Sequence, residues 1–309
     1  MIECRNLTKV YGDHVALNNL SLKLEAGDAF GFIGPNGAGK TTTIRILATL
    51  LEPTSGEALV GGYSVLQEAD DVRRILGYMP DQFGIYDGMR SYEYLEFFAA
   101  AYRVPRAKRP ALIKDVLEIT DLTGKREAFV ETLSTGMRQR LCLAKTLLHD
   151  PKVLVLDEPA SGLDPRARIE LKELIRELSR MGKTLLVSSH ILPELADFCN
   201  KVGILEGGVL LASGPVESIL ERASARVRSV RVTVLGDADK TEALLSAWAP
   251  LQNLRREGQV FHFDTEADLE TLADLLEKMV QDKVRVVHFG EEKTDLEKVF
   301  LQVTRGTVN

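Results

Sequence analysis

The segment that most restricts the fold of this chain is GPNGAGKT, residues 34–41. It follows an apolar run, AFGFI at residues 29–33, and precedes Ile44, Leu47 and Ala48, which repeat at helical spacing. A buried strand, a glycine-rich turn and a helix in this order are typical of an α/β domain. The glycines allow backbone N–H groups to hold phosphate oxygens at the start of the helix, where the helix dipole favours negative charge. The sequence therefore predicts an α/β fold with a phosphate-binding loop.

Each defined position of this segment matches the P-loop pattern G-x-x-x-x-G-K-[ST], which predicts a P-loop NTPase (RecA-like) core. Lys40 would neutralise the β- and γ-phosphates, and the Thr41 hydroxyl would ligate Mg²⁺. The loop and the first turn of its helix would supply the remaining nucleotide contacts, from Asn36, Gly37, Ala38, Gly39 and Thr42. A chance match is the alternative, and the flanking strand and helix argue against it.

Two carboxylates follow a second apolar run. VLVL at residues 153–156 is apolar throughout, as a central parallel strand covered on both faces should be, and Asp157 and Glu158 come next. An α/β sheet presents groups to its ligand at this end of its strands. Asp157 can hold Mg²⁺ through water, and Glu158 can act as general base towards the attacking water. In isolation the pair could be a solvated acidic turn before Pro159, but the P-loop in the same chain favours the catalytic interpretation.

The hydrophobic pattern indicates an inserted helical subdomain. Residues 91–118 carry two helical patterns that are interrupted around Pro105 and Pro110. We therefore expect a helical subdomain at about residues 88–150, inserted into an α/β domain that covers residues 1–222.

The pattern changes again at about residue 225. Strand and helix patterns then follow the order βαββαβ, provided that residues 251–255 form a strand, which predicts a small ferredoxin-like α+β domain over residues 225–309. Thr294 and Glu297 form a capping box that predicts a last amphipathic helix.

Composition excludes several classes of protein. A net charge of −6 argues against a nucleic-acid binder with a broad basic surface, so no nucleic-acid partner is expected. No apolar run approaches the ~20 residues needed to span a bilayer, and the first residues do not resemble a signal peptide, so we expect a cytoplasmic protein. The three cysteines are far apart in sequence, which favours reduced thiols over disulfides or a metal site.

A further motif makes the chain resemble the ATPase subunits of ABC transporters. LSTGM at residues 133–137, about 20 residues before Asp157, is similar to the family signature, in which Ser134 and Gly136 face the γ-phosphate. Ser134 can also cap a helix, and without its placement the segment would be an ordinary helix start. Two positions depart from the family, because Thr135 stands where glycine is usual and Met137 where glutamine is usual.

Four other residues follow the order of the family's motifs. Tyr11 resembles the aromatic residue that stacks on adenine, and Gln82 resembles the glutamine that contacts Mg²⁺ or the attacking water. Asp164 lies in a segment that resembles the loop crossing between paired subunits, and His190 resembles the histidine that contacts the γ-phosphate. Tyr11 could equally be a tyrosine at a strand end, and a single glutamine such as Gln82 carries little information by itself.

The resemblance, over about residues 1–222, implies an ATPase that uses ATP and Mg²⁺ and drives transmembrane transport. Glu158, His190 and Gln82 would be catalytic, and Thr41, Gln82 and Asp157 would contact the metal. Two copies would pair head to tail as a homodimer, with each ATP between one P-loop and the partner's signature. The resemblance also implies a separate transmembrane permease subunit and a peripheral position on the inner face of the cell membrane.

Two segments narrow the resemblance to the ATPases of ABC-2-type exporters, which include drug-resistance and gliding systems: SYEYLEFF at residues 91–98 and DLEKVFL at residues 295–301. The aromatic residues near Tyr86 would offer a docking groove for the permease, or they could form core. Two alternatives remain: a soluble ABC ATPase that acts on a ribosome or DNA, and a nucleotide-regulated module without transport. The acidic composition argues against the first, and the presence of Glu158 and His190 against the second.

Overall fold

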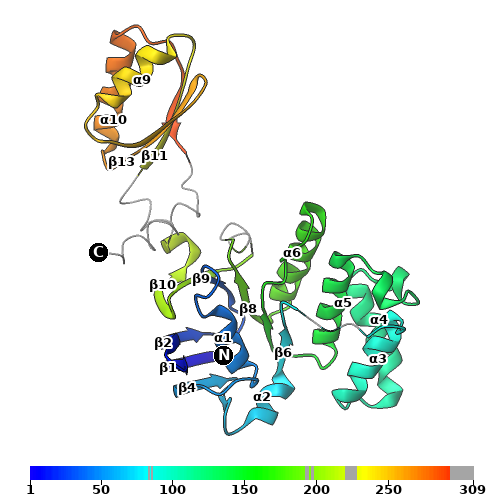
Figure 1. Cartoon of the computed structure of the whole chain (residues 1–309). Coiled ribbons are helices and arrows are strands. Elements are labelled where there is room, and N and C mark those ends of the chain that lie inside the picture. Colours follow the sequence, from blue (N-terminus) through cyan, green and yellow to red (C-terminus); the bar gives the residue numbers. More distant parts are fainter. Residues whose placement is uncertain (83, 85, 192–194, 196–197, 220–227, 293–309) are drawn as a thin grey trace. The chain divides into compact units, whose positions relative to one another are not determined.

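The strand before the glycine-rich turn, β3 (Ala29–Ile33), lies inside a six-stranded sheet in the computed structural model, which describes residues 1–82, 84, 86–191, 195, 198–219 and 228–292. The strand order is β10-β9-β3-β8-β7-β6, and all neighbours are parallel except β10 and β9 (Figure 1). The other strands are β6 (Leu76–Met79), β7 (Val153–Leu156), β8 (Thr184–Ser189), β9 (Lys201–Glu206) and β10 (Val209–Pro215). Strands β3, β7 and β8 are buried throughout, because other layers cover both faces of the sheet. The predicted parallel α/β core is confirmed.

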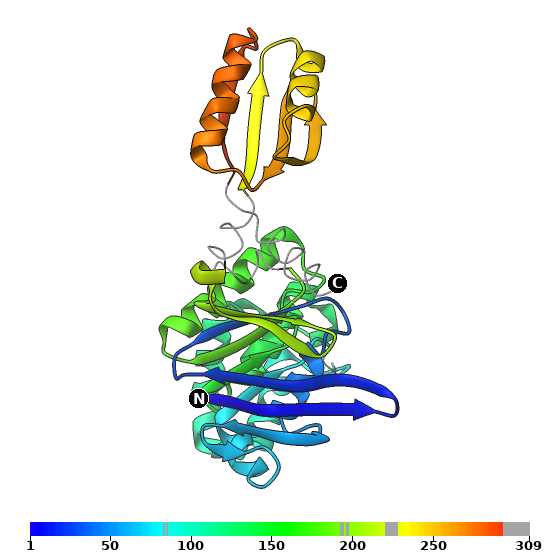
Figure 2. The same ribbon diagram turned by 90° about the vertical axis from the view of Figure 1, so that its left-hand side faces the viewer.

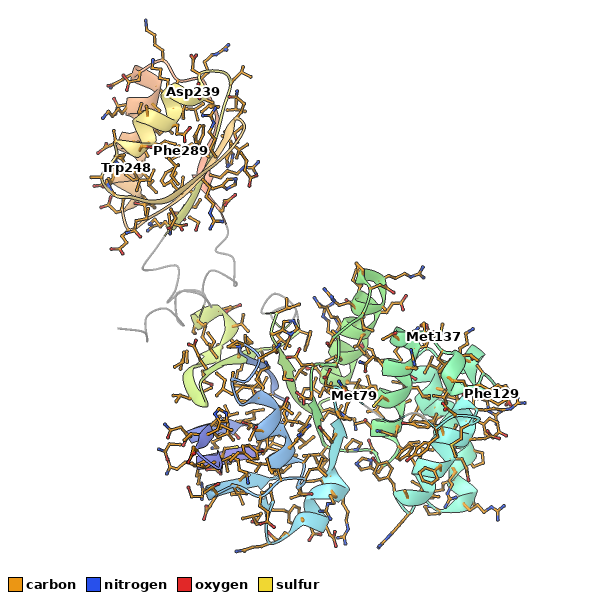
Figure 3. All side chains as sticks on the ribbon, in the orientation of Figure 1. Met79, Phe129, Met137, Asp239, Trp248 and Phe289 are labelled. Carbon is orange, nitrogen blue, oxygen red and sulfur yellow. The ribbon has the colours of Figure 1, made fainter. Side chains whose placement is uncertain are left out.

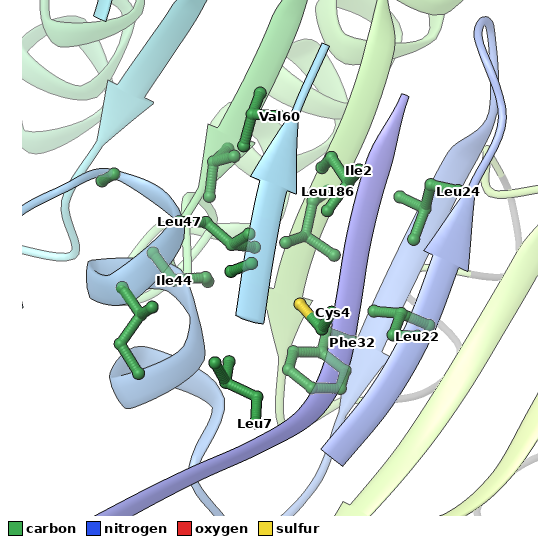
Figure 4. Close-up of a cluster of buried hydrophobic side chains, with 14 of the residues drawn as sticks. Ile2, Cys4, Leu7, Leu22, Leu24, Phe32, Ile44, Leu47, Val60 and Leu186 are labelled. Atoms are coloured by element: carbon green, nitrogen blue, oxygen red, sulfur yellow. The ribbon is translucent and has the colours of Figure 1, made fainter. Parts of the chain in front are cut away.

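A second, antiparallel sheet lies over one face of the central sheet (Figure 2), and helix α1 (Lys40–Leu47) shares one core with both sheets. Its order is β2-β1-β4-β5, formed by β1 (Ile2–Tyr11), β2 (His14–Leu24), β4 (Ser55–Val60) and β5 (Tyr63–Ser64). Apolar side chains from both sheets and from α1 form one core, in which Phe32, Ile44 and Leu186 pack with Ile2 and Val60 (Figure 4). This core fixes α1, and therefore the loop at its start, against both sheets.

Helices make up the segment between β6 and β7. They are α3 (Ser91–Ala101), α4 (Arg109–Ile119) and α5 (Thr135–Leu147), with the short helices η1 (Arg106–Lys108), η2 (Thr123–Lys125) and η3 (Val130–Thr132). Pro110 lies in the first turn of α4, where a proline removes no helical hydrogen bond. Helix α5 packs against α3 and α4, and also against β6 and α6 (Pro165–Arg180). Helix α2 (Ala69–Ile75) precedes β6.

The chain divides into two compact units, Met1–Val216 and Glu217–Asn309. The second unit has the predicted order βαββαβ, formed by β11 (Arg228–Val234), α9 (Ala238–Ser246), β12 (Leu251–Glu257), β13 (Val260–Thr265), α10 (Leu269–Gln281) and β14 (Val286–Glu291). Its strands are antiparallel in the order β12-β13-β11-β14, the ferredoxin-like topology, and the strand expected at residues 251–255 is present.

Alternate side chains of this sheet face the two helices. Val230, Val232, Phe261 and Phe263 form the core with residues of α9 and α10, and Trp248 and Phe289 pack against it (Figure 3). Helix α10 begins at Leu269, because the Asp268 side chain accepts a hydrogen bond from the Thr271 N–H and caps the helix there. The helix predicted to start near Thr294 lies outside the described residues.

Within the described part of the chain, no helix is long and apolar enough to cross a membrane. Cys4, Cys142 and Cys199 are buried free thiols, as predicted.

Candidate nucleotide-binding and catalytic site

The glycine-rich turn connects β3 to α1 in a conformation that requires glycine at its end. Gly39 caps α1 with φ of +107°, and a Cβ there would lie 2.6 Å from the Ala16 carbonyl oxygen. Lys40 is only 5% exposed, and its Nζ donates hydrogen bonds to the carbonyl oxygens of Gly34 at 2.7 Å and Pro35 at 3.3 Å. The Lys40 ammonium group is therefore held inside the loop, while Asn36 and Gly37 are exposed at its tip and Ala38 is buried.

Asp157 lies beside the start of α1, although it is 116 positions from Thr41 in sequence. Its Oδ1 accepts hydrogen bonds from Thr41 Oγ1 at 3.2 Å and from Ser188 Oγ at 2.7 Å. The Asp157 N–H donates to the carbonyl oxygen of Met79, the last residue of β6, and this bond holds the end of β7 in place. Hydroxyl and carboxylate oxygens are the ligands that Mg²⁺ prefers, so the Thr41 and Asp157 side chains fit that cation.

Glu158 connects the P-loop lysine to the candidate histidine. Its Oε1 lies 3.3 Å from Lys40 Nζ, and its Oε2 lies 2.8 Å from His190 Nδ1. The Glu158 backbone has φ of +47°, in the left-handed region, which turns its side chain to this position directly after Asp157. Half of the His190 side chain is exposed, whereas that of Glu158 is mostly buried. The structure thus brings together Lys40, Thr41, Asp157, Glu158 and His190.

Gln82 lies just after β6, and its side chain is exposed. Among the described residues, no hydrogen bond joins Gln82 to either carboxylate, so the structure does not bring this predicted residue into contact with them. Its neighbour Asp81 does interact electrostatically with the two carboxylates. Partial burial, and then the negative charges of Asp157 and Glu158, raise the pKa of Asp81. Sequence reasoning missed Asp81, although its place directly before Gln82 was visible.

Tyr11 ends β1, and its ring is 45% exposed. The Lys9 Nζ lies 5.1 Å from the ring centroid, a cation–π contact that leaves much of the ring open to solvent. Tyr11 therefore could stack on a base, and within the described residues it makes no direct contact with the catalytic group.

Ser134 and Asp164 each cap a helix. The Met137 N–H donates to Ser134 Oγ at 3.3 Å at the start of α5, and the Ala167 N–H donates to Asp164 Oδ1 at 2.9 Å at the start of α6. The two helix starts touch, because a Cβ added at Gly136 would lie only 2.8 Å from the Ala167 Cβ. Ser134 and Asp164 are exposed, and no hydrogen bond in the described part of the chain connects either side chain to the P-loop of the same chain.

Ser188 is a site residue that sequence reasoning missed. It is fully buried in β8, and its hydroxyl contacts both Asp157 and the Glu158 backbone. The sequence showed two serines before His190, but nothing in it indicated which of them faces the neighbouring strand.

Comparisons with known proteins agree with this site. The family model described as ABC transporter matches residues 17–161. The chain is 33% identical to the Nod factor export ATP-binding protein I of Cupriavidus metallidurans, over 98% of this chain and 97% of that protein. It is 28% identical to the linearmycin resistance ATP-binding protein LnrL of Bacillus subtilis, over 100% of this chain and 99% of that protein. A dimeric ATP-binding cassette solved in a post-hydrolysis state with ADP and Pi is similar in structure, with a TM-score of 0.64, 25% identity, and coverage of 70% of this chain and 99% of that one.

Proposed function

The chain belongs to the ABC transporter family as an ATP-binding protein, and from this premise we propose that it uses Mg-ATP to drive export through a separate membrane-spanning subunit. The observation that carries the proposal is the continuous set of contacts from Thr41 to Asp157 and from Lys40 through Glu158 to His190. These contacts join three motifs that are far apart in sequence.

Each residue of this set has a role that follows from its position. Lys40 and the backbone N–H groups of residues 36–42 bind phosphate oxygens. Thr41 and Asp157 would hold Mg²⁺, which neutralises phosphate charge when bound. Glu158 accepts a proton from the attacking water. His190 is hydrogen-bonded to the Glu158 carboxylate through Nδ1 and keeps that carboxylate in position near the γ-phosphate. Gln82 would contact the metal or the water, and Tyr11 the adenine.

We infer that two copies complete the site. Ser134 and Gly136 lie at an exposed helix N-terminus, where backbone N–H groups favour phosphate, and Asp164 lies at the adjoining helix start. The similar cassette is dimeric, which supports this arrangement. The test uses Glu158→Gln, which should bind ATP without hydrolysing it and so form a stable dimer on size-exclusion chromatography with light scattering. The control adds Ser134→Arg, which should keep the protein monomeric; a Glu158→Gln protein that stays monomeric in saturating Mg-ATP contradicts the composite site.

We propose that residues 1–222 form the ATP-binding domain, with a helical subdomain at about residues 88–150, and that residues 225–309 form an accessory domain. The division of the chain between Val216 and Glu217 supports a boundary in this region.

A groove beside β6 and α3 suits the membrane-spanning partner. It has a volume of about 720 Å³ and is lined by apolar Leu50 and Tyr102 together with Arg73, Arg103 and Lys145. Leu50 is 61% exposed, and the cations outnumber the acids among the lining residues. We therefore expect a short amphipathic helix with acidic residues to dock here, which would hold the protein on the inner face of the membrane.

Only part of the aromatic cluster near Tyr86 is available to this docking surface. Tyr94 is only 1% exposed and packs on Phe98 with ring centroids 4.9 Å apart, so it is core. Tyr86 and Phe97 are each 47% exposed and could extend the docking surface. The two interpretations of this cluster thus apply to different residues.

Export is favoured because the Nod factor and linearmycin proteins are both named for export or resistance and align over nearly their whole length. The class of exported substrate would be set by the partner. The net charge of −6 argues against the alternative of an ATPase that acts on a ribosome or DNA through a broad basic surface.

The experiment is purification of tagged Glu158→Gln protein with Mg-ATP from detergent-solubilised native membranes, followed by mass spectrometry. We expect a polytopic membrane protein in equal ratio, which Arg103→Glu should release and Arg180→Glu, an exposed charge reversal on α6, should retain. Ribosomal or DNA-associated proteins without a membrane partner would overturn the transport proposal and leave the ATPase chemistry.

A further inference from the structure

One buried hydroxyl contacts both acidic residues of the site. Ser188 is 0% exposed and lies in β8, two residues before His190. Its Oγ–H donates to Asp157 Oδ1 at 2.7 Å, and the same oxygen accepts a hydrogen bond from the Glu158 N–H at 2.9 Å. The two bonds run to consecutive residues at the end of the neighbouring strand β7.

The bond to the Glu158 N–H holds an unfavourable backbone conformation. A non-glycine residue rarely adopts φ of +47°, and such a conformation persists where surrounding contacts stabilise it. That turn places Glu158 Oε1 3.3 Å from Lys40 Nζ and Oε2 2.8 Å from His190 Nδ1. Without the Ser188 oxygen, this N–H would lose its acceptor and the Glu158 side chain its fixed direction.

The bond to Asp157 orients the other carboxylate. Asp157 is 1% exposed, so water has little access to replace a missing donor. The oxygen that Ser188 contacts is also the one 3.2 Å from Thr41 Oγ1. The hydroxyl therefore keeps this carboxylate oxygen beside Thr41, its expected partner in holding Mg²⁺.

We propose that Ser188 is a positioning residue of the ATPase: its two hydrogen bonds hold Asp157 for Mg²⁺ and Glu158 for the attacking water, while Ser188 itself touches neither nucleotide nor metal. This inference rests on the proposed function.

The test compares Ser188→Ala with Ser188→Thr, which keeps a hydroxyl, in the full-length chain. Thr184→Ala is the matched control, because Thr184 lies in the same strand, is 1% exposed and accepts a hydrogen bond from the Gly27 N–H at 3.0 Å. Loss of a residue that orients a metal ligand typically costs about 10- to 100-fold, so we expect Ser188→Ala to lower kcat by about that factor. The KM for Mg-ATP should rise by about 10-fold, because the metal adds less to ATP binding, whereas ATP binding without Mg²⁺ should stay unchanged because the P-loop contacts remain. Ser188→Thr should recover most of the activity, and Thr184→Ala should keep it.

A binding measurement separates positioning from packing. Wild type and Thr184→Ala should bind a fluorescent ATP analogue more tightly when Mg²⁺ is added, and Ser188→Ala should lose about 10-fold of that gain. If Ser188→Ala keeps both kcat and the Mg²⁺-dependent gain and only melts earlier, as Thr184→Ala does, Ser188 is a packing residue and the inference is overturned.

Two further outcomes are distinguishable. Should Ser188→Ala fail to fold, Ser188→Cys, which is of similar size and a weak donor, carries the same comparison. A wild-type protein that binds ATP but does not hydrolyse it contradicts the proposed function, while its Mg²⁺-dependent binding still tests Ser188.

Discussion

Replacing Gly136 by alanine adds one carbon and so tests how tightly the start of α5, which carries the LSTGM segment, packs against the start of α6. Gly136 lies in the first turn of α5, and a Cβ there would be 2.8 Å from the Ala167 Cβ in the first turn of α6. Ordinary contact begins at 3.4 Å, so the two helix starts would have to separate by at least about 0.6 Å. Overpacking of this kind costs about 1–3 kcal/mol. Because a unit of this size loses about 2–4 °C per kcal/mol, we expect Gly136→Ala to lower the melting temperature by about 2–12 °C.

A second substitution, at Ala167, tests whether the clash with its Cβ causes this loss of stability. Ala167→Gly removes the carbon that would clash, and in that background alanine at position 136 adds helix propensity worth up to about 1 kcal/mol. Gly136→Ala should therefore destabilise the wild-type protein but be neutral or stabilising beside Ala167→Gly. Urea unfolding of the four proteins of this double-mutant cycle measures the coupling, which we expect to reach about 1 kcal/mol or more.

ATPase activity should follow the same cycle, because the displaced helix starts carry the caps Ser134 and Asp164. An equal loss of stability from Gly136→Ala in both backgrounds would refute the reasoning, since the cost would then not arise at Ala167.

Three further predictions concern stability and reactivity. Asp28→Asn should lower the free energy of unfolding by about 1–3 kcal/mol at pH 7, because the Asp28 carboxylate accepts hydrogen bonds from Lys201 Nζ, Asn200 Nδ2 and the Glu25 N–H. Burial acts to raise the pKa of Asp28, but these donors hold it below 3.8. The stabilisation is therefore present above pH 3.8 and lost as the pH falls through the lower folded value, so acid unfolding curves of variant and wild type should converge, and a constant difference would contradict this. Phe261→Ala should destabilise the second unit by about 3–5 kcal/mol, and the fluorescence of Trp248, the only tryptophan in the sequence, reports its unfolding. ATP binding by the first unit should persist, and an equal loss of ATP binding would argue against independent units. Burial raises the pKa of Cys4 to about 12, so a disulfide reagent should label Cys4 only on unfolding, and rapid labelling of the native protein would show that this strand opens.

The sequence contained enough to predict the centre of the site. The run at residues 153–156 is apolar throughout, and such strands lie parallel and central, so the groups at their carboxyl ends converge on one edge of the sheet. The glycine-rich loop follows β3, a strand of the same kind. The contact of 3.2 Å between Thr41 and Asp157 is the outcome of that rule, which uses only local pattern and sheet geometry.

Ser188 and the contact between Gly136 and Ala167 depend on information of a different kind. The periodicity of residues 184–189 shows that Ser188 and Ser189 face opposite sides of a strand, but it cannot say which side meets Asp157. That is set by the parallel register in which Leu156 lies opposite Val187, and the register results from packing of the whole sheet. In the same way, a sequence shows that two helices begin with caps but not that the helix starts touch.

The same geometry explains why the two departures in the signature are compatible with the fold. Position 137 contributes its backbone N–H to the Ser134 cap, a contact that any residue except proline can make, and Thr135 is exposed. Only Gly136 is fixed by a neighbour that leaves no room for a side chain. We therefore expect Met137→Gln to change the free energy of unfolding by less than about 0.5 kcal/mol, as is usual for positions without such a contact. A larger loss in urea unfolding would mean that the Met137 side chain, and not the glycine contact, holds the start of α5 in place.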